Sequence, residues 1–158
     1  MLNVKVMSRD NAIKYCQCQH DTPTVMISIS DPYIQYFEYP FCDDRNKVLA
    51  IQRVYFTDAD KPGKDVYGRS VEESDLITDG DAFLIKRLLK KFPDTDVIVH
   101  CDAGISRSSG VAAAILKTYT GDDSQIFDSP RYRPNMRCYR LVLNELMRAD
   151  FSWGESDA

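Results

Sequence analysis

The stretch DVIVHCDAGISRSSGVAAAILK (96–117) decides the fold class of this chain. Its start, residues 96–101, is mostly apolar and rich in β-branched side chains, which is typical of a buried strand. Its end predicts a helix over residues 107–119 whose inward-facing side chains are Val111, Ala114, Ile115 and Leu116. A short polar turn that contains Gly104 joins the two. A buried strand that turns directly into a helix is typical of α/β sheets, whose ligands bind beyond the carboxyl ends of the strands.

The remaining chain alternates strands and helices in the same way. Strands are predicted over residues 2–6, 24–30 and 48–56. Helices are predicted over residues 9–18 (capped by Ser8), 78–92, 122–129 and 134–149 (with Pro134 in its first turn). The helix over 78–92 is expected to carry apolar side chains at helical spacing, namely Phe83, Leu84, Leu88 and Leu89. We therefore expect an α/β fold in a single domain, residues 1–158, with a central mostly parallel sheet of about four or five strands, helices on both faces, and a frayed tail over 150–158.

Charge and composition exclude several classes of partner. The chain of 158 residues has a net charge of −4, which argues against general affinity for nucleic acid or an anionic membrane. It contains no apolar run near the roughly 20 residues of a membrane span, and its first residues lack the features of a secretion signal. Its 5 cysteines are irregularly spaced, which favours reduced thiols. We expect a cytoplasmic monomer, and no metal at CQCQH (16–20), because no second ligand pair accompanies it.

The turn after the strand has the parts of an anion cradle. The first N–H groups of the following helix are unpaired and carry partial positive charge. Gly104 lets the loop fold so that the amides of Asp102, Ala103, Gly104, Ile105 and Ser106 point inward. Arg107 adds a planar cation that matches two phosphate oxygens. The sequence therefore predicts a binding site for a phosphate dianion at residues 102–107.

Cys101 lies at the point where this cradle is most positive. A thiol at a helix N-terminus beside a cation has a pKa of roughly 3.5–7.5 in place of about 8.5. The resulting thiolate would attack phosphorus and form a cysteinyl-phosphate that water later cleaves. Arg107 and the loop amides would stabilise the transition state. His100, the neighbouring residue on the strand, points to the opposite face and is expected to order the loop from behind.

HCDAGISRS (100–108) resembles the HCxxGxxR[ST] signature of the cysteine-based protein tyrosine phosphatases. The AGxSRS form and the short chain make it most similar to the dual-specificity subgroup, and it is also similar to small bacterial and phage-type phosphatases. The resemblance extends to VYFTDAD (54–60), to the helices on either side of the signature and to Pro134-Asn135. It implies phosphomonoester hydrolysis without a cofactor, with Cys101 as nucleophile and Arg107 as phosphate clamp. Ser108 would hydrogen-bond the thiolate, and Asn135 would either support the loop or only begin the last helix.

The general acid is the least determined member of the site. The resemblance implies an aspartate after the strand over 48–56, and the long polar connection over 57–77 offers several. We favour Asp58 because it follows the strand directly, with Asp60 as the alternative. The remaining candidates are Asp65, Asp75 and Asp79.

Several features keep more than one interpretation. The arginines Arg131, Arg133, Arg137 and Arg140 form either a solvated edge or a rim that attracts acidic phosphopeptides. The aromatic residues Tyr33, Tyr36, Phe37, Tyr39 and Phe41 form either a wall for a phosphotyrosyl ring or ordinary packing. The sequence does not decide whether Cys42 or Cys138 forms a protective disulfide with Cys101.

The expected substrate is a phosphorylated protein or peptide, but three other functions stay open. The chain could be an inactive phosphate-recognition module. It could act on a non-protein phosphate, although the loop has no lysine and Asp102 adds negative charge. Thiol chemistry of the rhodanese or arsenate-reducing kind also uses a cysteine in a loop.

Overall fold

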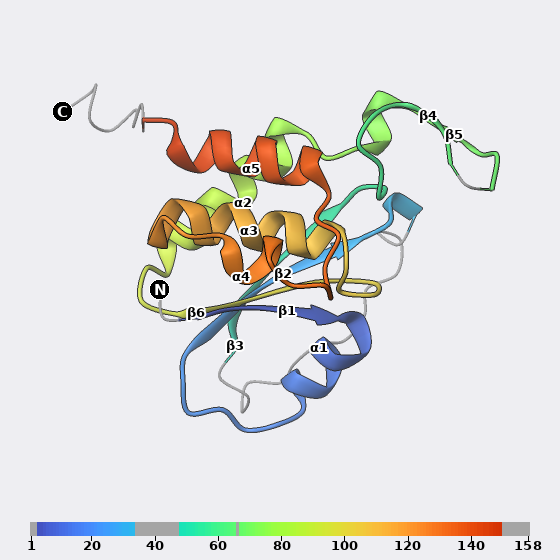
Figure 1. Ribbon diagram of the computed structural model, residues 1–158. Helices are drawn as coiled ribbons and strands as arrows, with labels where there is room; N and C mark the ends of the chain where they lie inside the picture. Colours follow the sequence, from blue (N-terminus) through green and yellow to red (C-terminus); the bar gives the residue numbers. More distant parts are fainter. Residues whose placement is uncertain (1–2, 34–47, 66, 150–158) are drawn as a thin grey trace.

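The computed structural model describes residues 3–33, 48–65 and 67–149. Its centre is a four-stranded, all-parallel sheet in the order β1-β6-β2-β3 (Figure 1). The strands are β1 (Val4–Ser8), β2 (Thr24–Ser30), β3 (Val48–Tyr55) and β6 (Asp96–Cys101). Parallel pairing brings the carboxyl ends of all four strands to one edge, where Ser8 pairs with Cys101 in register.

Helices cover both faces of the sheet, as the sequence predicts. The helix α1 (Arg9–Cys16) lies on one face, and the other four helices lie on the opposite face (Figure 1). These are α2 (Asp79–Lys91), α3 (Arg107–Thr120), α4 (Ser124–Phe127) and α5 (Met136–Met147). The α/β fold with a parallel central sheet is therefore confirmed, with four strands in that sheet. Several predictions concern residues outside the described ranges, namely the tail over 150–158, the aromatic residues Tyr36, Phe37, Tyr39 and Phe41, and Cys42.

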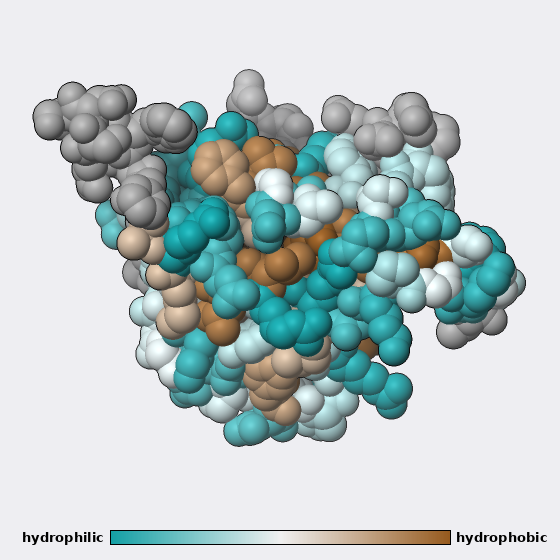
Figure 2. Space-filling model, turned by 90° about the horizontal axis from the view of Figure 1, so that it is seen from above, coloured by the Kyte–Doolittle hydropathy of each residue, from teal (hydrophilic) through white to brown (hydrophobic). Residues whose placement is uncertain are grey.

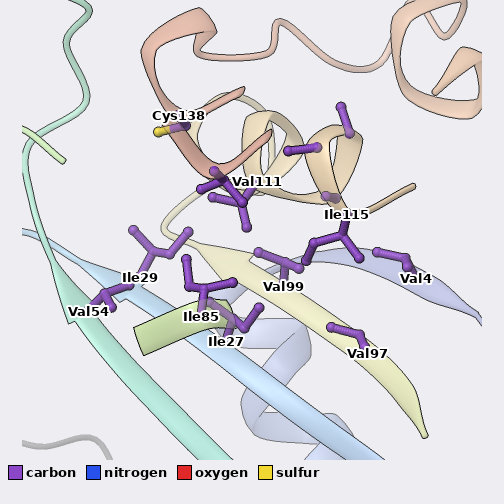
Figure 3. Close-up of a cluster of buried hydrophobic side chains, with 14 of the residues drawn as sticks. Val4, Ile27, Ile29, Val54, Ile85, Val97, Val99, Val111, Ile115 and Cys138 are labelled. Atoms are coloured by element: carbon purple, nitrogen blue, oxygen red, sulfur yellow. The ribbon is translucent and has the colours of Figure 1, made fainter. Parts of the chain in front are cut away.

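Strand alternation divides the core between the two faces. Every residue of β2 is buried, because the strand is central and covered on both sides. On β6, Val97 and Val99 belong to the larger cluster beneath α3, where they face Val111 and Ile115 (Figure 3). Ile98 points the other way and packs in a smaller cluster with residues of α1 and β2, namely Ala12, Cys16 and Met26. By the same alternation Cys101 points to the α3 side and His100 to the α1 side.

Some element bounds differ from the predictions, and so does the position of the buried stripe on α2. The last helix begins at Met136 because Asn135 caps it, accepting a hydrogen bond from the Cys138 amide at 3.0 Å, so Pro134 lies outside the helix. Phe83 is 52% exposed, whereas Ala82, Ile85 and Leu89 are buried, so the buried stripe of α2 runs one position away from Phe83.

The polar connection after β3 is more ordered than the sequence indicates. It forms an antiparallel hairpin of β4 (Gly63–Lys64) and β5 (Ser70–Val71), followed by a 3₁₀ turn, Glu73–Asp75. At the tip, Asp65 accepts hydrogen bonds from the amides of Tyr67 (2.9 Å) and Arg69 (2.8 Å). Regular pairing replaces the expected loop because a single carboxylate satisfies the donors of the turn.

Gly110 allows α3 and α5 to approach closely, and replacing it should destabilise the fold. A Cβ at this position would lie 2.4 Å from the Asn135 carbonyl oxygen and 3.0 Å from the Cβ of Cys138. We expect Gly110→Ala to lower the free energy of unfolding by about 1–3 kcal/mol, measured by urea denaturation. Gly80→Ala is the matched control, because its nearest contact would be 3.5 Å and alanine favours a helix. Equal stability of Gly110→Ala and wild type would contradict close packing at this point.

Candidate active site

The loop over 101–107 joins β6 to α3 and turns sharply at Gly104. Gly104 has a φ of +73°, which favours glycine, and its backbone packs against the end of β1. A Cβ here would lie 2.7 Å from the Met7 carbonyl carbon and 2.8 Å from the Ser8 nitrogen. The loop therefore depends on glycine for both its conformation and its contact with β1.

Cys101 lies at the bottom of this loop with only 3% of its surface exposed. Its Sγ is 3.0 Å from the Ser108 Oγ. Burial alone raises the pKa of the Cys101 thiol, but the side chain and amide of Ser108, the charge of Arg107 and the Gly104 amide together outweigh it. The pKa therefore lies below its ordinary value, and the hydroxyl of Ser108 can donate to the thiolate.

Arg107 is buried and held by three elements. Its Nη1 donates to Asp31 Oδ1 at 2.9 Å and to the Phe56 carbonyl oxygen at 2.8 Å, while Nη2 donates to Asp102 Oδ2 at 3.3 Å. These contacts come from the residues after β2 and β3 and from the loop itself. They fix the guanidinium plane, and they leave Nε without an acceptor among the described residues.

Asp58 reaches the loop, whereas Asp60 does not contact it. Asp58 Oδ1 accepts a hydrogen bond from Ser106 Oγ at 2.8 Å and another from Asn135 Nδ2 at 2.9 Å. Asp60 instead pairs with Arg140 of α5 at 3.4 Å. The other three candidates have local structural contacts instead. Asp65 accepts hydrogen bonds at the hairpin tip, Asp75 closes a 3₁₀ turn, and Asp79 lies in the first turn of α2. The structure thus brings Asp58 together with Cys101 and Arg107 around one loop.

Solved structures share this arrangement of sheet and helices, although no protein-family model and no curated protein matches the sequence. Human DUSP28 aligns with 17% identity over 90% of each chain, with a TM-score of 0.57. A human tyrosine phosphatase-like serine/threonine/tyrosine-interacting protein aligns with 17% identity over 90% of this chain and 89% of its own, with a TM-score of 0.55. Cydia pomonella PTP-2 phosphatase aligns with 15% identity over 91% and 86%, with a TM-score of 0.50.

The chain has the fold of the dual-specificity-like tyrosine phosphatases. The resemblance drawn from HCDAGISRS is thereby confirmed at the level of the fold. In this phosphatase fold the signature residues occupy the turn from β6 to α3, which is the place that the sequence indicates.

His100 supports the loop of this phosphatase fold from beneath. It is fully buried, and its Nδ1 lies 3.1 Å from the Cys101 carbonyl oxygen. Because a carbonyl oxygen only accepts, Nδ1 carries the proton and Nε2 accepts from the Ser28 hydroxyl at 2.7 Å. Burial lowers the pKa of His100 from 6.5 to about 4, so the ring is neutral at physiological pH.

Asn135 both begins the last helix and contacts the loop, which are the two roles that the sequence leaves open. Its side-chain oxygen caps α5, and its Nδ2 also donates to the Ala59 carbonyl oxygen at 3.2 Å. Its backbone amide donates to the Ser106 carbonyl oxygen at 3.0 Å. Asn135 therefore joins α5, the loop and the segment that carries Asp58. Cys138, one turn later, is fully buried, and burial raises the pKa of its thiol, so it remains protonated.

Asp102 and two residues outside the signature complete the charged surroundings of the loop. The Asp102 carboxylate is paired with Arg9 as well as Arg107. Neither Arg9 nor Asp31 belongs to the signature. Asp31 directly follows the predicted strand over 24–30, and this position at the carboxyl edge of the sheet is the sequence signal that would have indicated it. Arg9 directly follows β1 as the structure has it, which ends two residues later than the predicted strand over 2–6.

An open cavity of about 620 Å³ adjoins the loop. Its lining includes Asp31, Asp58 and Asp102, and from the β4–β5 hairpin and its approach it includes Lys61, Lys64, Asp65, Tyr67 and Arg69. Seen from above, the hairpin forms a mostly hydrophilic lobe at the right edge of the molecule (Figure 2). Tyr67 is 80% exposed, and the Arg69 guanidinium carbon lies 5.2 Å from its ring centre. The hairpin thus extends the wall beside the loop.

Three of the arginines near the start of α5 make contacts within the protein. Arg137 pairs with Glu73 at 2.6 Å and, like Arg140, fastens the connection after β3 to α5. Arg133 donates its backbone amide to the Ile105 carbonyl oxygen at 3.0 Å. Among the described residues no group of three or more His, Cys, Asp or Glu side chains could hold a metal ion, and none of the helices they form is long and apolar enough to cross a membrane.

The buried neutral His100 should make the protein sensitive to acid. Its pKa is lower in the folded chain than in the unfolded chain, so the unfolded chain takes up a proton first as the pH falls below 6.5. Between pH 7 and pH 4.5 this histidine should remove about 2–3 kcal/mol from the free energy of unfolding. In urea denaturation, His100→Gln should lose stability at pH 7 but show a smaller further loss at pH 4.5. His20→Gln, which removes the second of the 2 histidines, should keep the wild-type dependence. An unchanged pH dependence in His100→Gln would contradict the assignment.

Proposed function

We propose that this protein hydrolyses phosphomonoesters, with phosphotyrosine as the preferred substrate and phosphoserine or phosphothreonine as further substrates, through a cysteinyl-phosphate intermediate. The observation that carries the proposal is the Cys101 thiol, whose pKa is lowered where it lies under a glycine-bent loop between Ser108 and Arg107. A buried inert cysteine would have a raised pKa, as Cys138 has.

Substrate binding uses the loop amides and the guanidinium. The amides over 102–107 and the Nε edge of Arg107 would hold the phosphate oxygens, with phosphorus above the Cys101 sulfur. The contacts of Arg107 with Asp31 and the Phe56 carbonyl oxygen keep its plane in place before substrate arrives. The charge of the transition state is then stabilised by groups that need not reorganise.

Two displacements complete the reaction. In the first, the thiolate of Cys101 forms a bond to phosphorus, the ester P–O bond breaks, and protonated Asp58 gives its proton to the departing oxygen. In the second, water attacks phosphorus, Asp58 accepts its proton, and the S–P bond breaks to release phosphate. Ser108, at 3.0 Å from the sulfur, donates a hydrogen bond to the thiolate as it departs. The thiolate and the arginine suffice for this chemistry, so the proposed reaction uses neither metal nor cofactor.

A phosphorylated protein or peptide fits the surroundings of the loop better than a polyphosphorylated small molecule. The loop itself contributes no lysine, and its Asp102 already engages two arginines. The adjoining cavity has an exposed aromatic ring, Tyr67, on its hairpin side, where the ring of a phosphotyrosine or a neighbouring peptide residue could lie. We further propose that the protein acts as a monomer in the cytoplasm.

An inactive phosphate-recognition module is the alternative that the fold alone would allow. It is disfavoured because Cys101 and Ser108 lie in hydrogen-bond contact and Arg107 is held in the same loop. A recognition module needs the amides and the arginine but has no use for a thiol of lowered pKa.

Removing the thiol should abolish hydrolysis without abolishing anion binding. We expect Cys101→Ser to lower kcat for p-nitrophenyl phosphate at least about 10³-fold, because a serine hydroxyl is not ionised at neutral pH. Vanadate should inhibit the wild-type enzyme. Cys138→Ser is the control for loss of a buried thiol, and it should keep most of the activity of the fraction that folds. Undiminished hydrolysis by Cys101→Ser would contradict the proposed mechanism.

Asp58 and Asp60 can be separated by their pH profiles. Asp58→Asn should lower kcat about 10²–10⁴-fold with an aryl phosphate whose leaving group needs a proton, and the alkaline limb of the profile should flatten. With p-nitrophenol, a better leaving group, the loss should be smaller. Asp60→Asn removes a carboxylate of the same segment that contacts Arg140 instead of the loop, so it should behave as wild type. If Asp60→Asn shows the larger loss, the acid is misassigned.

A further inference from the structure

The junction between β1 and α1 forms the support on which the loop over 101–107 rests. Ser8, the last residue of β1, pairs in register with Cys101, and Gly104 packs on Met7 and Ser8. The Arg9 backbone amide donates to the Asp102 carbonyl oxygen at 3.2 Å. Three contacts therefore tie this one junction to the proposed nucleophile and to the loop that follows it.

The Arg9 side chain extends the same junction across the carboxyl edge of the sheet. It is only 13% exposed. Its Nη2 donates to Ser30 Oγ at 2.8 Å and to the Ile29 carbonyl oxygen at 3.4 Å, both at the end of β2. Its Nη1 forms an ion pair with Asp102 Oδ1. Arg9 thus connects β1, β2 and the loop after β6. Hydrogen bonds to backbone carbonyl oxygens and the ion pair with Asp102 both hold it in place.

The ion pair with Arg9 offsets the negative charge that Asp102 places beside Cys101. The residue directly follows Cys101, and its carboxylate holds Nη2 of Arg107 at 3.3 Å. An anion at this place would repel both the thiolate and a phosphate dianion, and it would weaken the positive charge that Arg107 offers them. With Arg9 on the other carboxylate oxygen, the pair is neutral while the hydrogen bond to Arg107 is retained.

The other charged groups around the site do not neutralise Asp102. Asp31, after β2, is paired with Arg107, and Asp58, after β3, accepts from Ser106 and Asn135. The cavity wall also carries Lys61 and Lys64, and Lys64 donates to the Ser70 hydroxyl at 3.3 Å. Arg9 is the described cation, apart from Arg107, that contacts Asp102.

We propose that Arg9 is a positioning residue of the phosphate site, which neutralises Asp102 so that this carboxylate can orient Arg107 without cancelling its charge. Arg9 does not touch the substrate. It acts through Asp102 on Arg107 and on the Cys101 thiolate. This inference deepens the proposed function and rests on it for the activity measurement, whereas the thiol and anion measurements below do not need turnover.

The decisive comparison is between Arg9→Gln and the double variant Arg9→Gln/Asp102→Asn. In Arg9→Gln the carboxylate of Asp102 keeps Arg107 as its counterion and therefore reduces the positive charge that Arg107 offers to the thiolate and the anion. The pKa of the Cys101 thiol, read from the pH dependence of alkylation by iodoacetamide, should rise by about one unit, and kcat/KM for p-nitrophenyl phosphate should fall at least about tenfold. Protection of the thiol by inorganic phosphate should require a higher phosphate concentration.

The double variant removes the charge that Arg9 balances. It should return the alkylation profile to that of Asp102→Asn alone and recover most of the activity lost in Arg9→Gln, because no carboxylate remains at position 102 to reduce the charge of Arg107. Arg9→Lys should keep part of the function, since the positive charge is retained but the contacts with β2 are not. Arg87→Gln, which removes an exposed arginine of α2, is the control for a change in net charge and should behave as wild type.

A purely structural role for Arg9 predicts the opposite pattern. The double variant would then be no better than Arg9→Gln in thiol pKa and phosphate protection, and that result would overturn the proposal. If the wild-type protein hydrolyses no phosphate ester but the alkylation and protection data follow the expected order, the proposed function fails while the role of Arg9 stands. Wild-type thiol pKa and phosphate protection in Arg9→Gln would refute the role of Arg9 regardless of turnover.

Discussion

The close contact between Gly104 and the backbone of Met7 and Ser8 is the constraint on which the rest of the site depends. A glycine with φ of +73° lets the loop turn back over the end of β1, within a distance that a side chain would not allow. That turn brings the Gly104 amide to the Cys101 thiol and is followed by Arg107 at the first position of α3. Without this contact, Cys101 would still end a buried strand, but the proposed phosphate-binding loop would not turn back above it.

The parallel sheet then brings the remaining groups to the same place. β1 delivers Arg9, β2 delivers Asp31, and β3 is followed by Asp58, all at the carboxyl edge where β6 ends in Cys101. Asp31 and Asp102 are paired with arginines, and Asp58 accepts hydrogen bonds from the neutral side chains of Ser106 and Asn135. This arrangement is compatible with the proposed dianion site in a chain of net charge −4.

Sequence patterns with a local physical cause were predictive. The strands over 24–30 and 96–101 and the Ser8 cap agree with the structure, because they follow from burial, alternation and a single hydrogen bond. Asn135 is also recognisable from the sequence as a helix-start residue, but the general preference of proline for a first turn places the start of the last helix two residues too early. The β4–β5 hairpin and the pairing of Arg9 with Asp102 were not predictable, because each depends on contacts between residues that the sequence separates by other elements or by a turn without an apolar pattern.

The central claim is that one anion site lies directly above the Cys101 sulfur. A crystal structure of the protein with orthovanadate tests it most directly. We predict that vanadium is bound to the Sγ of Cys101, that its equatorial oxygens accept hydrogen bonds from the amides over 102–107 and from Arg107, and that Asp58 faces the apical oxygen. Vanadate bound elsewhere, for example among Lys61, Lys64 and Arg69 of the cavity wall with the thiol unmodified, would contradict the account.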